Sequence, residues 1–267
     1  MKAHFKIMGV INVTPDSFSD GGKYFQTEKA VNHALALIQQ GAEIIDIGGE
    51  STRPGADSVS EDEELKRVIP VIQAIRKKNT EITLSIDTSK AEVMAQAIKA
   101  GANFVNDVNA LQNPNCMEIV AKAGVPVCLM HKQGTPKNMQ NKPQYADILT
   151  EVMAFLQEKI DNCLLAGIKR ENIILDVGIG FGKTLEHNLT LLRNIKKLKN
   201  KLNYPLLIGV SRKSMIGELL HNKVDERLYG SLAIAQFAYL QGVEIIRVHD
   251  VKATYDVLKV TQALLEK

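Results

Sequence analysis

Eight short apolar runs recur along this chain, and amphipathic helical stretches separate them. The runs are rich in Ile and Val and do not alternate with polar residues, as expected of strands buried on both faces of a parallel sheet. Eight strand–helix units in one chain of 267 residues predict a (β/α)8 TIM barrel of the α/β class. The runs span residues 4–12, 42–52, 81–89, 102–108, 125–131, 172–178, 205–214 and 244–251.

The spacing of the runs also predicts a single domain over residues 1–267. A unit of about 34 residues agrees with a barrel of about 250 residues. No Pro/Ser-rich linker and no low-complexity segment divides the sequence. In a TIM barrel the active site lies at the carboxyl ends of the strands. The fold prediction therefore also indicates where functional side chains should gather.

Composition limits the classes of partner. The net charge of +3 is too small to argue for nucleic acid, and the basic segment 196–201 has no interleaved aromatics and is interpreted as a solvated helix face. No apolar run reaches 18 residues and no signal peptide is evident, which predicts no membrane partner. A cytoplasmic protein with reduced thiols is expected, because no cysteines form a C-x-x-C pair. The three cysteines are Cys116, Cys128 and Cys163.

Local signals predict loops and helix boundaries. The polar, Gly/Pro-containing loops 14–24 and 51–60 are longer than a barrel needs, and we interpret them as lids over the site; a third long segment is 131–144. Thr27 is expected to precede the first helix. Thr88 or Ser89 is expected to cap the helix that ends at Gly101.

Every predicted strand carries polar or charged residues at or near its carboxyl end. One such residue means little, because a strand-end Asp is often only the cap of the next helix. Candidates on all eight strands, converging on one barrel mouth, favour a functional site. The candidates are Asn12, Asp46, Glu50, Thr52, Arg53, Asp87, Asn106, Asp107, His131, Asp176, Ser211, Arg212, Lys213, Arg247, His249 and Asp250.

These side chains fall into two chemical groups. Carboxylates can accept two parallel N–H donors from one ring edge, which suits a donor-rich planar heterocycle. Cationic and amide groups suit an anion such as phosphate or diphosphate. The pattern therefore predicts a ligand that joins a nitrogen heterocycle to phosphate. The first group is Asp87, Asn106 and Asp176, and the second is Asn12, Arg53, Lys213, Arg247 and His249.

The segment Gly178–Thr184 resembles a phosphate-binding P-loop. The pattern requires glycine six residues before the lysine, at position 177, and the chain has Val177 there. The loop is thus one residue short, and the repeats favour a barrel over a nucleotide-hydrolase sheet. The glycines are more simply explained as letting the backbone approach a flat ligand. No histidine pair has zinc-site spacing, although Mg²⁺ held partly through a substrate diphosphate fits the residues.

The motifs together closely resemble those of the dihydropteroate synthase family. The most specific are MGVINVTPDSFSDGG at 8–22, DIGGESTRPGA at 46–56, GVSRKS at 209–214 and RVHDV at 247–251. The motifs IDTSK at 86–90, NDV at 106–108 and GIGFGKT at 178–184 occur in family order. The resemblance covers almost the whole chain.

The resemblance implies a reaction and its requirements. The enzyme would join 4-aminobenzoate to (7,8-dihydropterin-6-yl)methyl diphosphate, giving 7,8-dihydropteroate and diphosphate with Mg²⁺ present. Departure of diphosphate would leave a pterin-methyl cation, which a weak aryl amine can attack without a strong base. The resemblance further implies folate biosynthesis, a homodimer and a sulfonamide target.

The resemblance also implies residue roles, by motif. Asn12 binds the metal. The diphosphate meets Thr52, Arg247 and His249. The pterin is held by Asp87, Asn106, Asp176 and Lys213, and the substrate site further includes Met130, Phe181 and Gly209. The aminobenzoate is bordered by Arg53, Pro54 and Ser211. The residues implied in catalysis are Asp87, Lys213, Arg247 and His249.

Two departures and two alternatives remain. The family usually has Pro and Phe where this chain has Val177 and Ile179, and often Met in place of Lys132; neither change removes a catalytic group. A pterin-dependent methyltransferase on the same barrel would need a corrinoid partner and no diphosphate-binding pair. A non-catalytic pterin-binding homologue should have lost the lid or anion residues, and the sequence retains them.

Overall fold

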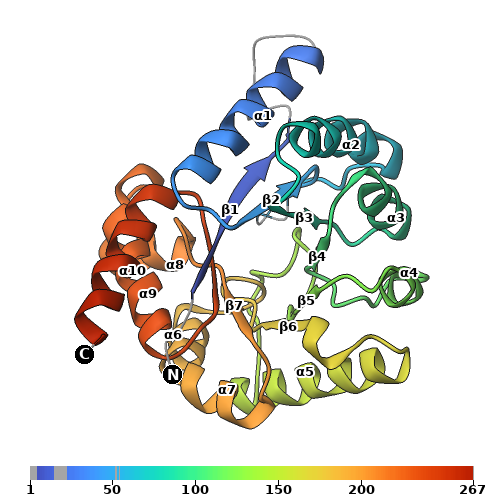
Figure 1. Cartoon of the computed structure of the whole chain (residues 1–267). Helices are drawn as coiled ribbons and strands as arrows, with labels where there is room; N and C mark the ends of the chain where they lie inside the picture. Colours follow the sequence, from blue (N-terminus) through green and yellow to red (C-terminus); the bar gives the residue numbers. More distant parts are fainter. Residues whose placement is uncertain (1–4, 15–22, 52, 54, 267) are drawn as a thin grey trace.

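The eight predicted strands close into one parallel barrel in chain order, which confirms the (β/α)8 prediction (Figure 1). The computed structural model describes residues 5–14, 23–51, 53 and 55–266. The strands are β1 (Lys6–Asn12), β2 (Ile44–Gly48), β3 (Thr83–Asp87), β4 (Phe104–Asp107), β5 (Val127–Met130), β6 (Ile173–Asp176), β7 (Leu206–Ile208) and β8 (Ile245–Val248).

Helices surround the barrel (Figure 1). They are α1 (Lys23–Gln39), α2 (Glu61–Lys78), α3 (Ala91–Ala100), α4 (Cys116–Ala123), α5 (Ile148–Leu165), α6 (Leu185–Arg193), α7 (Ile195–Leu202), α8 (Ser214–Leu220), α9 (Leu228–Leu240) and α10 (Val251–Leu265). Two 3-10 turns, η2 (Arg170–Asn172) and η3 (Val224–Glu226), precede β6 and α9.

Two helix starts differ from the sequence prediction. Helix α1 begins at Lys23, ahead of Thr27, because residues 23–26 contain no glycine or proline to stop a helix. Lys90, and not Thr88 or Ser89, is the N-cap of α3. The Thr88 Oγ1 accepts from the Lys90 N–H at 3.3 Å, so this hydroxyl closes a turn before the helix. Gly101 ends α3 in the left-handed conformation, as predicted.

Inward-facing side chains form two levels inside the barrel. One level is an apolar interior layer that fills the barrel, as the packed core of this fold requires. Two residues further along each strand, side chains face inward again, because strand side chains alternate. At this second level, nearer the carboxyl ends, β2, β4, β6 and β8 carry the polar side chains Asp46, Asn106, Asp176 and Arg247. The interior layer comprises Met8, Ile44, Phe104, Cys128, Ile174, Leu207 and Ile245.

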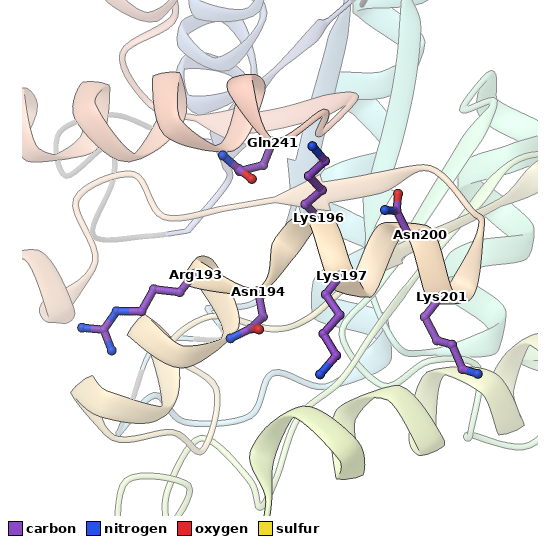
Figure 2. Close-up of a pocket in the computed structure, with 7 residues that line it drawn as sticks. All are labelled: Arg193, Asn194, Lys196, Lys197, Asn200, Lys201 and Gln241. Atoms are coloured by element: carbon purple, nitrogen blue, oxygen red, sulfur yellow. The ribbon is translucent and has the colours of Figure 1, made fainter.

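The basic segment lies outside the barrel on α7. Lys196, Lys197 and Lys201 are exposed, as predicted for a solvated face, whereas Lys199 is half-buried and pairs with Glu244. With Arg193 and Gln241 the three exposed lysines line a hollow of about 690 Å³ (Figure 2). Lys201 and Gln241 lie a few residues before β7 and β8 in the chain, so the hollow is near the ends at which these strands begin. The hollow is therefore remote from the strand ends that carry the candidate chemistry. In the part of the chain that the structure describes, no helix is long and apolar enough to cross a membrane.

Candidate active site

A cation held by two carboxylates stands at the centre of the barrel mouth. Arg247 on β8 donates from Nε to Asp46 Oδ2 at 2.6 Å and from Nη2 to Asp87 Oδ2 at 2.7 Å. The Nδ2 of Asn106 donates to the same Asp46 oxygen at 3.0 Å. Register places these groups together, because Gly48, two residues after Asp46, pairs with Asp87, and Asp87 pairs with Asn106. Strands β2, β3, β4 and β8 are thus joined by one buried polar network.

The network has a strong electrostatic consequence. Burial raises the pKa of Asp87 to about 7, and the nearby Arg247 only partly offsets that rise. Burial alone would lower the pKa of Arg247, but Asp46 and Asp87 raise it above its ordinary value, so the guanidinium stays charged. The mouth therefore contains one permanent cation beside a carboxyl group that can exchange a proton near neutral pH.

Asp176 at the end of β6 lies beside the loop that follows it. Its Oδ1 accepts from the Gly178 N–H at 2.7 Å, and burial raises its pKa. Among the described residues no hydrogen bond reaches Oδ2. One carboxylate oxygen is thus fixed by the loop, and the other is available to a ligand donor.

Lys213 reaches the same loop from the segment after β7. Its Nζ donates to Ile179 O at 2.6 Å and lies 4.6 Å from the centre of the Phe181 ring. Burial lowers the pKa of Lys213 to about 8, against the attraction of Asp176. Lys213, Phe181 and Asp176 thus form one side of the mouth, with an ammonium, a ring face and a carboxylate.

The turn before Lys213 is held in an uncommon backbone conformation. Arg212 has φ +58°, which a residue with a side chain rarely adopts. Its guanidinium makes a bidentate pair with Asp250, its N–H donates to Ser231 Oγ at 3.0 Å, and its carbonyl accepts from Arg227 at 3.1 Å. These contacts fix the turn and so orient Ser211 and Lys213 on either side of Arg212.

His249 lies next to Ser211 at the end of β8. Its Nδ1 lies 3.1 Å from Ser211 Oγ, and its backbone N–H donates to the same oxygen at 3.2 Å. Burial lowers the pKa of His249 to about 4, and Arg247, Arg53 and Arg212 lower it further. The imidazole is therefore neutral at pH 7 and acts as a hydrogen-bonding group when no anion is present.

The other predicted site residues are distributed as follows. Met130 is buried opposite Asp176 in the register of β5 and β6. Gly209 lies beside Arg247, and a Cβ there would be in ordinary contact with the Arg247 Cβ at 3.6 Å. Asn12 is half-buried at the end of β1, and Arg53 is exposed. Thr52, Pro54 and the predicted lid segment 15–22 lie outside the described residues.

The remainder of the second predicted lid is tied to the barrel. The Gly55 N–H donates to Pro136 O at 2.9 Å, which joins this loop to the segment after β5. The Val59 N–H donates to Glu50 Oε1 at 2.7 Å, and Lys90 holds the other oxygen of Glu50. Residues 55–60 are thus held beside the mouth by hydrogen bonds at Gly55 and Val59.

Three residues depart from the family pattern, and none of them hydrogen-bonds to the mouth network, which consists of Asp46, Asp87, Asn106 and Arg247. Val177 and Ile179 are fully buried in the apolar core outside the strands, so both changes are changes of packing. Lys132 lies close enough to Asp107 to oppose the burial that raises the pKa of that carboxyl to about 6. The two oxygens of Asp107 accept from the N–H groups of Asn109 and Leu111 at 2.7 Å, which makes its role structural.

Sequence reasoning gave no role to two buried polar groups. Asp46 was one of many strand-end candidates. The pairing of its strand, β2, with β3, which carries Asp87, is the feature that places Asp46 in the mouth network. Lys183, in the P-loop-like segment, is only 2% exposed and contacts His131. Its burial excludes the phosphate-binding role that the motif suggests, and the closed barrel excludes a nucleotide-hydrolase sheet.

Comparisons with known proteins agree with this architecture. The pterin binding enzyme family model matches residues 8–249. The dihydropteroate synthase of Escherichia coli strain K12 is 52% identical over 263 residues, which cover 98% of this chain and 93% of that protein. The Yersinia pestis dihydropteroate synthase in a sulfonamide drug complex superposes with a TM-score of 0.93 at 48% identity, covering 99% of this chain and 96% of that one. The Xanthomonas albilineans enzyme with 4-aminobenzoic acid gives a TM-score of 0.93 at 45% identity, covering 99% and 94%.

Proposed function

The chain belongs to the dihydropteroate synthase family of pterin-binding enzymes, which condense a pterin with 4-aminobenzoate in folate biosynthesis, and we propose how its barrel mouth divides that work. The observation that carries the proposal is the buried network in which Arg247 bridges Asp46 and Asp87 beside Asn106. This network supports a site in which acceptors for a heterocycle lie next to a permanent cation for diphosphate.

The pterin half of the substrate is assigned to the side of the mouth around Asp176. Its free Oδ2 and the Asn106 amide offer acceptors to ring N–H groups, and Lys213 donates to a ring acceptor. Phe181, Met130 and Gly209 would border the flat ring. A carboxylate, an amide and an ammonium facing one ring edge would distinguish a pterin from a ring with the reverse donor pattern.

The diphosphate half is assigned to Arg247 and His249, together with Thr52. When the C–O bond to diphosphate breaks, its electron pair leaves with the phosphate oxygen and positive charge develops on the pterin methyl carbon. Arg247 stabilises the departing anion, and the Asp87 carboxylate stabilises the cation. An anion beside the neutral His249 would raise the pKa of that imidazole, so the site would gain a second cation as the leaving group forms.

Mg²⁺ is the metal that the residues fit. Asn12 supplies one side-chain oxygen, and among the described residues no hydrogen bond engages its amide. Within the same residues, no group of three or more His, Cys, Asp or Glu side chains could hold a metal by itself. One protein oxygen plus phosphate oxygens and water is a common arrangement for Mg²⁺. When bound, the metal would supply further positive charge to the leaving diphosphate.

The second substrate, 4-aminobenzoate, is assigned to the rim. Arg53 would pair with its carboxylate, while Ser211 and Pro54 would border its ring. The aryl nitrogen would then form the new C–N bond and release a proton to water. We infer that segments 14–24 and 52–60 close over the rim after the pterin binds, because water would otherwise capture the cation.

Three further proposals concern the oligomeric state, the location and the domain organisation of the enzyme. We propose a homodimer, supported by exposed apolar side chains on α8, α9 and α10, which lie on one side of the barrel (Figure 1). We propose a cytoplasmic enzyme, supported by three buried cysteines that are not bonded to one another. We also propose that residues 1–267 work as one domain. The apolar side chains are Leu219, Leu220, Tyr229, Phe237, Leu240, Val260, Leu264 and Leu265.

One assay tests the reaction. Purified protein should release diphosphate from (7,8-dihydropterin-6-yl)methyl diphosphate only when 4-aminobenzoate and Mg²⁺ are both present. Binding of the pterin diphosphate without turnover would instead support a non-catalytic homologue. Methyl transfer that needs a corrinoid partner would support the methyltransferase alternative.

A further inference from the structure

The loop between β6 and α6 carries Phe181 and hydrogen-bonds to Asp176 and Lys213, three of the groups assigned to the pterin. The Gly178 N–H holds Asp176, the Ile179 carbonyl holds Lys213, and the Phe181 ring lies under the Lys213 ammonium. The geometry of this loop therefore sets the geometry of one side of the mouth. What fixes the loop is a separate question, because loop residues lack the hydrogen-bond ladder of the strands.

Part of the answer is a close contact between two backbones. A Cβ on Gly178 would lie 1.8 Å from the His131 carbonyl oxygen, and a Cβ on Gly182 would lie 2.3 Å from the Gln133 carbonyl oxygen. Both glycines have left-handed φ values, +68° and +64°. The loop is therefore pressed against the segment that follows β5.

Lys183 fastens this contact from inside. Its Nζ lies 2.9 Å from His131 Nδ1 and donates to the carbonyls of Phe181 at 3.1 Å and His131 at 3.4 Å. An ammonium has three donors, and these three acceptors use all of them. The partners come from both sides of the contact, the loop after β6 and the segment after β5. None of the three is a carboxylate.

The His131 ring is itself held in place. The Phe155 ring meets it edge-on, with 4.9 Å between ring centres, and Tyr145 lies 6.0 Å away. While Lys183 is an ammonium it can only donate, so His131 Nδ1 then accepts and the imidazole proton lies on Nε2. Burial, together with the neighbouring Lys183, lowers the pKa of His131 to about 3, so the ring remains neutral.

We propose that Lys183 is a positioning residue of the pterin site, which ties the loop 178–182 to the end of β5 and thereby holds Asp176, Phe181 and Lys213 in place. It rests on the pterin assignments above but adds a residue that touches no substrate. Burial of an ammonium is unfavourable, and burial lowers the pKa of Lys183 to about 7. A buried lysine whose hydrogen-bond partners are all neutral therefore contributes little to stability. Its three contacts join the loop 178–182 to the segment after β5, which indicates a role in positioning the loop.

The test compares Lys183→Met with Lys159→Met. Lys159 on α5 is a second buried lysine, 9% exposed; it pairs with Glu158 and lies 5.1 Å from the centre of the Phe155 ring, but it donates to neither His131 nor the loop 178–182. In Lys183→Met we expect the dissociation constant of the pterin diphosphate, measured by calorimetry, to rise about tenfold or more. The KM for 4-aminobenzoate should stay within about twofold of wild type, because Lys183 hydrogen-bonds to neither Arg53 nor Ser211. Lys159→Met should change neither constant.

Two further variants keep the test decisive if Lys183→Met does not fold. Lys183→Arg retains donors and should recover part of the pterin affinity. His131→Ala removes one of the three acceptors and should weaken pterin binding less than Lys183→Met. Adding His131→Ala to a Lys183 variant should have little additional effect, because both changes break one contact.

Several outcomes would overturn the proposal. The first is a folded Lys183→Met variant whose pterin affinity stays within about twofold of wild type. The second is a rise of the pterin dissociation constant and of the KM for 4-aminobenzoate by the same factor. The third is a loss of pterin affinity in Lys159→Met as large as that in Lys183→Met. Failure of the underlying function would look different, since wild-type protein itself would then form no dihydropteroate.

Discussion

The two inward-facing levels of the barrel use the same strands for opposite purposes. On β4, Phe104 packs in the apolar interior layer, and Asn106, two residues on, hydrogen-bonds to Asp46. On β8, Ile245 packs in the interior layer, and Arg247, two residues on, bridges two carboxylates. A step of two residues thus separates a packed core from a charged site.

The difference shows how the fold supports a buried charge cluster. The interior layer removes apolar surface from water and holds the strands at fixed separations. On that base, ionic groups are held in a geometry that costs stability, because burying charges is unfavourable unless they are paired. Asp46 Oδ1, at the mouth level, is buried without a hydrogen-bond partner, an arrangement that costs stability. Stability and chemistry should therefore respond separately to substitutions at the two levels.

The largest effect is expected in the interior layer. Phe104→Ala should lower the free energy of unfolding by about 3–5 kcal/mol, because it leaves a cavity that the barrel cannot close. Pterin affinity of the folded fraction should change less than about threefold, since Asn106 keeps its bond to Asp46. Denaturant titration and calorimetry measure the two quantities. A loss of affinity as large as the loss of stability would show that the levels are not separable.

At the mouth, Arg247→Ala should damage the chemical step. Loss of one preorganised cation should reduce kcat/KM by about 10²-fold, or about 2.7 kcal/mol. Steady-state kinetics with the pterin diphosphate would measure this. A pterin analogue without diphosphate should lose much less affinity, the remaining loss arising because Arg247 also holds Asp87. If affinity for the analogue falls as much as kcat/KM for the pterin diphosphate, Arg247 acts on the ring and not on the leaving group.

Asp176→Asn should weaken pterin binding by about 1–3 kcal/mol, because an amide presents one donor where the ligand needs an acceptor. Stability should change little, since the new side chain can still accept from the Gly178 N–H. Asp107→Asn is the matched control, because Asp107 is also a buried strand-end carboxylate but caps a turn. That variant should lose stability and keep pterin affinity. Unchanged affinity in Asp176→Asn would remove Asp176 from the site.

The sequence predicted the barrel and most positions of its mouth for a clear physical reason. Uniform Ile/Val runs are typical of strands buried on both faces, and the ends of parallel strands converge. Asp87, Asn106, Asp176 and Arg247 could therefore be placed together before any coordinates. The functional roles of these residues remain predictions, and Thr52 and Pro54 lie outside the residues that the structure describes.

The specific pairings could not be predicted. Arg247 and Asp46 are 201 positions apart in the chain, and their contact depends on how the closed barrel sets the register between strands. Lys183 and His131 are 52 positions apart, and the P-loop-like spacing around Lys183 pointed toward phosphate. Single-residue signals can place a side chain at a strand end or in a loop. Only the packed structure shows whether it faces a ligand or another side chain.

The smallest expected effect concerns the pH dependence of stability at His131. Its pKa is lowered to about 3 in the folded state, so below about pH 6.5 the unfolded chain takes up a proton that the folded chain does not. This residue therefore makes stability fall as pH falls. Asp87 has the opposite sign, because its raised pKa lets the folded chain bind a proton first below about pH 7. The wild-type curve sums both contributions, and only a difference between variants isolates His131.

His131→Asn provides that difference, because the amide oxygen can still accept from Lys183 but does not titrate. Between pH 6.5 and 5.5, the free energy of unfolding of wild type should fall relative to this variant by about 1 kcal/mol. Denaturant titrations at several pH values would measure the gap. Phe104→Ala serves as the control from the interior layer, since it removes no titrating group and its gap from wild type should not vary with pH. A constant gap for His131→Asn as well would mean that the folded protein protonates His131 as readily as the unfolded chain. Lys183 could then not be donating to its Nδ1.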